Sequence, residues 1–84
     1  MTLPSQPVTL TVEQVAQLNR KLSTMRHDIN NHLSVLLAAV ELIRSKPEAV
    51  GRMITAVAEQ PRRISDAVAG FSAEFEKALG IMRN

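Results

Sequence analysis

One stretch of this chain runs from Thr11 to Ser45 without a proline or a glycine. Its seam positions, spaced at alternating steps of three and four, are Val15, Leu18, Leu22, Met25, Ile29, His32, Leu36, Ala39 and Ile43. A heptad pattern sustained over four repeats is typical of a long helix that packs against other helices. Thr11 and Gln14 also have the spacing of a capping box, which marks a helix N-terminus. The pattern therefore predicts a helix over residues 11–45.

A second periodic stretch begins at Pro47, which cannot continue the first helix but fits the first turn of another. Its apolar positions are Val50, Ile54, Val57, Pro61, Ile64, Val68, Phe71, Phe75 and Ala78. Because the pattern keeps its phase across Pro61, we expect a kinked but continuous helix over residues 47–79. Gly80 has the place of a C-cap residue. Residues 1–10, with two prolines, are expected to form an extended or flexible arm, and residues 81–84 a short tail.

A chain of 84 residues is one domain with a thin core, because so short a chain buries only about 60% of its unfolded surface. The apolar stripe widens in the second half of the first helix, at Leu33, Leu37 and Val40. Two wide stripes need more partners than one hairpin provides. We therefore expect an all-α fold over residues 11–80, an antiparallel two-helix hairpin that homodimerises into a four-helix bundle.

The composition excludes several classes of function. The chain has no cysteine and two histidines, so neither a disulfide framework nor a structural zinc site is expected. Its three scattered glycines cannot form a nucleotide-binding loop. A net charge of +2, without a dense basic face or stacking aromatic residues, disfavours binding to nucleic acid. No signal peptide or membrane-spanning run is apparent, so we expect a cytoplasmic protein.

The chemically informative segment is Arg26–Leu33, with the sequence RHDINNHL. At about 100° per residue, His27 points away from the seam and into solvent, while His32 faces mostly inward. Asn31 lies one turn from His27 on the same face, and Asp28 lies on its flank. An exposed neutral imidazole beside a carboxylate can act as a nucleophile, for example toward a phosphoryl group. For His32 we expect a hydrogen bond across the bundle.

The pattern Arg26-His27-Asp28-x-x-Asn31-His32-Leu33, followed by a second helix, resembles the phosphoacceptor box of bacterial two-component sensor histidine kinases. It is most similar to the variant found in citrate- and dicarboxylate-type sensors and in the sporulation phosphotransferase. In that family the segment belongs to the dimerisation and histidine phosphotransfer domain, a hairpin that dimerises into a four-helix bundle. The resemblance implies that His27 is the phosphoacceptor, that Asp28 assists transfer and that Asn31 positions water for dephosphorylation.

The same resemblance implies that the partners are a second copy of the chain and a response-regulator receiver domain, with a histidine kinase as a further candidate. Mg²⁺ would be held by the receiver, and this chain would bind no cofactor. Two features depart from the family: His32 stands where many such kinases have a proline, and only five residues follow residue 79, where such a kinase has its ATP-binding domain. We therefore expect either a module that exchanges phosphoryl groups with other proteins but does not phosphorylate itself, or a fragment of a longer kinase.

Reflection of His27 across a hairpin centred near residues 46–47 places Arg62, Arg63 and Asp66 near its level on the second helix. Together with Arg26, they are candidates for contacts with an acidic receiver surface or a phosphohistidine. Two alternatives remain open at this point. The chain could be a non-catalytic dimeric adaptor or inhibitor of a kinase or regulator, with His27 an ordinary surface histidine. It could also be a small basic bundle that binds nucleic acid, which the charge pattern disfavours.

Overall fold

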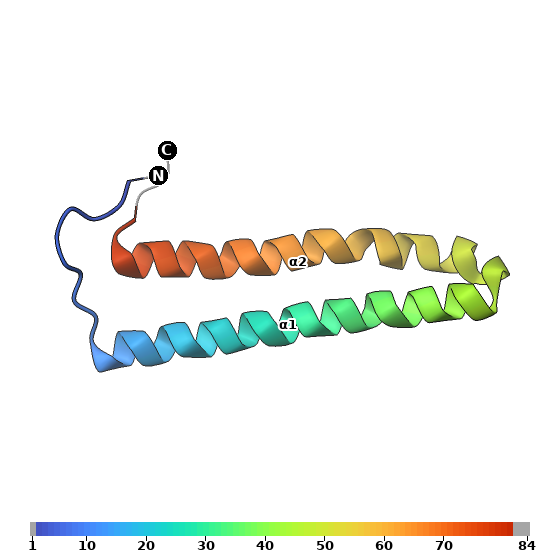
Figure 1. Ribbon diagram of the computed structural model, residues 1–84, viewed down its shortest axis with the longest axis horizontal. Helices are drawn as coiled ribbons and strands as arrows, with labels where there is room; N and C mark the ends of the chain where they lie inside the picture. Colours follow the sequence, from blue (N-terminus) through green and yellow to red (C-terminus); the bar gives the residue numbers. More distant parts are fainter. Residues whose placement is uncertain (1, 82–84) are drawn as a thin grey trace.

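The computed structural model describes residues 2–81. Helix α1 spans Val12–Ser45, a single 3-10 turn η1 spans Pro47–Ala49, and helix α2 spans Val50–Leu79. The two helices run antiparallel along their whole length (Figure 1). The predicted all-helical hairpin is confirmed.

Helix α1 begins at the predicted capping box. The backbone N–H of Gln14 donates to Thr11 Oγ1 at 3.0 Å, and the N–H of Thr11 donates to Gln14 Oε1 at 2.8 Å. Each residue thus satisfies a backbone donor that the first turn of a helix leaves without a partner. The segment before the cap is not helical and crosses the open end of the hairpin (Figure 1).

The connection between the two α-helices is longer than the sequence predicts, because it includes residues 46–49 and not residue 46 alone. Lys46 leaves the helical conformation (φ −137°, ψ 82°), and the N–H of Ala49 then donates to its carbonyl at 2.8 Å. Pro47 occupies the first turn of η1, as expected of a residue without an N–H, but the α-helix itself starts at Val50. The α-helical part of the second element therefore begins three residues later than predicted. Ala49, which is fully buried, closes the end of the hairpin.

Helix α2 is continuous through Pro61, as predicted. It ends at Gly80, which has the left-handed conformation (φ 70°, ψ 26°) that glycine adopts without steric cost. The N–H of Ile81 donates to the carbonyl of Glu76 at 2.8 Å, and that of Gly80 to Lys77 at 3.4 Å. These two bonds form a Schellman motif, so the predicted C-cap is confirmed.

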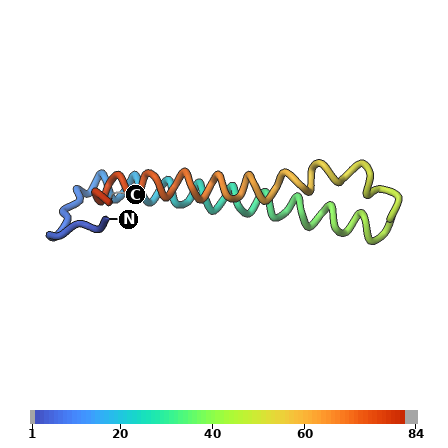
Figure 2. The backbone as a smooth tube through the Cα atoms, turned by 90° about the horizontal axis from the view of Figure 1, so that it is seen from above, coloured from blue at the N-terminus to red at the C-terminus, as the bar shows by residue number. Residues whose placement is uncertain are grey.

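The hairpin is elongated and thin. Its radius of gyration is 18.0 Å, whereas a compact domain of this length has about 12 Å. Only three residues among 2–81 are buried: Ala39, Ala49 and Gln60. Seen from above, the two helices form a single narrow layer (Figure 2). Neither helix of the described part has the length and apolar character needed to cross a bilayer.

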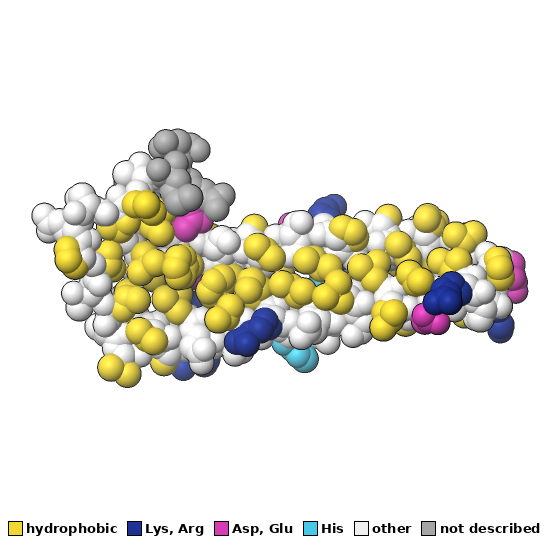
Figure 3. Space-filling view, in the orientation of Figure 1, with side chains coloured by type: hydrophobic (Ala, Val, Ile, Leu, Met, Phe, Trp, Pro, Cys, Tyr) yellow, Lys and Arg dark blue, Asp and Glu magenta, His cyan; other side chains and the backbone are white. Residues whose placement is uncertain are grey.

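One face of this layer is covered with hydrophobic side chains from both helices (Figure 3). Large apolar residues that remain exposed on the helices are Val12, Val15, Leu33, Val35, Leu37, Val40, Val50, Ile54, Val68 and Phe75. The accessible surface is 6510 Å², about 1,600 Å² more than the size scaling gives for a compact 9.2 kDa protein. The hairpin alone therefore leaves much of its apolar surface in water.

Candidate functional site

His27 lies in the middle of α1 with its side chain exposed, as predicted. Asn31, one turn later and also exposed, places its Nδ2 at 3.3 Å from His27 Nε2. An amide nitrogen only donates, so Nε2 accepts and the proton of the neutral ring resides on Nδ1. A neutral ring that accepts this long hydrogen bond presents Nε2 at the surface without a proton.

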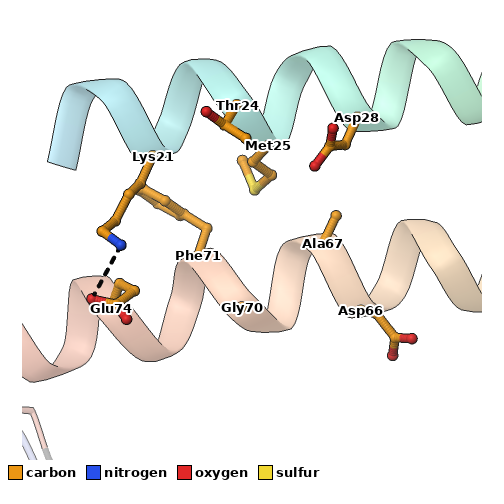
Figure 4. Close-up of a pocket in the computed structure, with 9 residues that line it drawn as sticks. All are labelled: Lys21, Thr24, Met25, Asp28, Asp66, Ala67, Gly70, Phe71 and Glu74. Carbon is orange, nitrogen blue, oxygen red and sulfur yellow. Dashed lines mark ion pairs between the residues drawn. The ribbon is translucent and has the colours of Figure 1, made fainter. Parts of the chain in front are cut away.

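Asp28 takes a different direction from the one that its flanking position suggested. Its side chain is half-buried and points toward α2, where it lines a groove between the helices that Asp66 also lines (Figure 4). Within residues 2–81 the hydrogen bond to the His27 ring comes from Asn31, and Asp28 makes none to it. The structure therefore brings His27 together with Asn31, whereas Asp28 and Asp66 border the same groove and their side chains do not point toward each other (Figure 4).

The groove owes its width to small residues on α2. Ala67 and Gly70 lie opposite Thr24 and Asp28, and a Cβ at Gly70 would meet no atom within 4 Å. At its far end Lys21 Nζ lies 3.7 Å from Glu74 Oε2, and both side chains are about half exposed (Figure 4). Ion pairs this exposed contribute little to stability, because water screens them.

His32 faces α2, and its predicted hydrogen bond across the hairpin is present. Its Nδ1 lies 2.8 Å from Oε1 of Gln60, whose Nε2 donates to the carbonyl of Ala56 at 3.0 Å. Gln60 is 7% exposed, and among residues 2–81 it is the one polar residue that is buried. Sequence reasoning did not single out Gln60, although reflection across the turn places residue 60 or 61 opposite His32.

The contacts His32–Gln60 and Lys21–Glu74 place residues 65 to 68 of α2 level with His27. Asp66 lies at that level, as predicted, and is exposed. Arg62 and Arg63 lie about one turn nearer the hairpin turn. Arg63 Nη2 is 3.5 Å from Glu59 Oε2, and Arg62 borders a shallow surface formed by α2 alone. Arg26 is exposed beside His27.

No protein-family model, curated protein or solved structure matches this chain. In residues 2–81 no group of three or more histidine, aspartate or glutamate side chains could hold a metal ion together.

Proposed function

We propose that this chain is a phosphohistidine signalling module that exchanges a phosphoryl group with the receiver domain of a response regulator. In the forward step His27 Nε2 attacks the phosphorus of an aspartyl phosphate on the receiver. The N–P bond forms, the P–O bond to the aspartate breaks, and the carboxylate leaves with the bond electrons. The observation that supports this most directly is the exposed His27 ring, whose Nε2 faces the Asn31 amide at 3.3 Å.

Asn31 has a second use in this proposal. Its contact with Nε2 is long, so the amide can shift to a phosphoryl oxygen as the N–P bond forms, or orient a water for hydrolysis on the receiver. Nδ1 keeps its proton throughout and carries part of the positive charge that develops on the ring. The receiver supplies Mg²⁺, which neutralises charge on the transferring group.

The proposal includes pairing of two hairpins into a four-helix bundle. Its support is the exposed apolar face and the surface excess of about 1,600 Å² described above. At about 100° per residue, Val15, Leu33 and Val40 lie about 120° to 140° around α1 from His27. A second copy that covers those residues would leave His27 and Asn31 accessible to a receiver.

Phosphoryl transfer is tested by incubating the full chain with a receiver domain that has been phosphorylated with acetyl phosphate. We expect label to move to this chain in an acid-labile, base-stable linkage, and His27→Gln to abolish it. The matched control is His32→Gln, which alters the other histidine and should keep the label. Label that persists in His27→Gln, or a wild-type chain that accepts none from any receiver it binds, would contradict the proposal.

One observation favours a second candidate, a dimeric adaptor that binds a receiver or kinase without chemistry. Asp28 is turned into the groove, so the carboxylate expected to assist transfer makes no hydrogen bond to the imidazole. The same experiment separates the two functions. Binding of the receiver without transfer of label, unchanged in His27→Gln, is the result expected of an adaptor.

A further inference from the structure

Pro61 lies inside α2, and the helix continues through it from Val50 to Leu79. Proline has no backbone N–H, so the carbonyl of Val57 lacks the donor that a regular helix supplies, and the ring crowds that carbonyl. Sharp helix kinks occur mostly at such positions. Helix α2 therefore has a weak point between the half beside the hairpin turn and the half level with His27.

Gln60, the residue before this proline, binds both α2 and α1. Its Nε2 donates to the carbonyl of Ala56 at 3.0 Å, within the weakened turn. Its Oε1 accepts from His32 Nδ1 at 2.8 Å. Because the amide nitrogen is engaged by Ala56, the amide oxygen is directed toward α1. A single buried side chain thus ties the weak turn of α2 to the opposite helix.

The apolar side chains beside this hydrogen bond are only partly buried. The buried residues Ala39 and Ala49 lie toward the hairpin turn, and Val57 and Ile64, which flank Gln60 on α2, are only half-buried. The ion pair Lys21–Glu74 lies several turns away and is about half exposed. The hydrogen bond between His32 and Gln60 is therefore the most specific contact between the helices near Pro61.

We propose that the His32–Gln60 hydrogen bond is a latch on a hinge in α2 at Val57–Pro61. While the bond is made, both halves of α2 keep one alignment against α1. When it breaks, α2 bends at Pro61, and the half that carries Asp66 shifts relative to His27. A partner that binds the bent form more tightly opens the latch, since a ligand shifts such an equilibrium by its difference in affinity. The latch does not depend on phosphotransfer.

The test is amide hydrogen exchange of the full unphosphorylated chain, followed residue by residue by NMR. Gln60→Met keeps the side-chain length and removes both polar atoms. We expect exchange of the amides of residues 62–65, just beyond the proline, to become about fivefold faster, with little change at residues 73–77. In a Pro61→Ala background the same substitution should have no local effect, because an uninterrupted helix has no hinge to release.

His32→Phe serves as a second variant, since it keeps a ring in place and removes the donor to Gln60. It should reproduce the local increase, and combined with Gln60→Met it should add nothing further. Two results would overturn the latch. One is an increase spread evenly along α2, and the other is an equal increase with alanine at position 61. Either would make the His32–Gln60 pair an ordinary packing contact.

Discussion

The two histidines of this chain use their ring nitrogens in opposite ways. His27 accepts at Nε2 from an exposed amide one turn away on its own helix, whereas His32 donates from Nδ1 to a buried amide on the other helix. The first contact leaves the ring open to a visiting molecule. The second contact makes the ring part of the packing between the helices, where it resists any shift of α2.

These contacts differ in how far the sequence predicts them. The pairing of His27 with Asn31 depends only on helical spacing, so it follows from the sequence alone. The direction of Asp28 and the role of Gln60 depend on the register between two helices. That register is set by the tight turn at Pro47–Ala49, and Asp28 finds room toward α2 because Ala67 and Gly70 are small. Helical periodicity carries no information on either point.

Replacement of Asn31 by alanine removes the donor to His27 Nε2, and we expect the neutral His27 ring to become a mixture of its two tautomers. Imidazole nitrogen chemical shifts, measured by NMR, would show the change. The signals of His32 are the internal control, because Gln60 still accepts its Nδ1 proton. A wild-type His27 protonated on Nε2 would contradict this assignment.

At the scale of the elements, the sequence predicts the start of α1 and the end of α2 more closely than it predicts the start of α2 at the hairpin turn. Thr11 caps the start of α1 and Gly80 caps the end of α2, each through hydrogen bonds between residues close in sequence. The capping residues therefore suffice to predict these two boundaries from the sequence. The start of α2 was predicted three residues early. There the chain must also return antiparallel to α1, and closing that path gives Pro47–Ala49 a 3-10 rather than an α conformation.

Gly70 and Gly80 make a matched pair for testing whether Gly80 is needed as the cap at the end of α2. A Cβ meets nothing within 4 Å at either position, but only Gly80 has a positive φ. Gly80→Ala should lower the free energy of unfolding by about 1 kcal/mol, because alanine is strained in the left-handed conformation. Gly70→Ala should raise it by up to about 1 kcal/mol through helix propensity. Urea unfolding followed by circular dichroism measures both, and a loss of stability in both variants would contradict the argument.

At the scale of the whole molecule, the hairpin has the apolar stripes typical of a helical bundle, but much of the apolar surface on those stripes is exposed. Periodicity predicts which residues lie on each apolar stripe, and the space-filling view shows hydrophobic side chains of both helices gathered on one face (Figure 3). What covers that face does not follow from periodicity, because a second copy and a different helical partner would bury the same residues. A charged residue introduced on this face should weaken association if the face pairs with another helix, and should have little effect if the face is only exposed to water.

Ile54, which is 55% exposed on the apolar side of α2, provides that test. In the proposed dimer Ile54→Glu would bury a carboxylate without a partner, so we expect dimerisation to weaken about a hundredfold. Thr55→Glu is the matched control, since the next residue points about 100° away around the helix and its charge would stay in water. Sedimentation equilibrium over a range of concentrations measures both dissociation constants.

The paired-hairpin arrangement fails if the wild-type chain is monomeric at every concentration, or if both variants weaken association equally. A monomeric Ile54→Glu variant that still accepts phosphoryl groups at His27 would show that the chemistry needs only one hairpin.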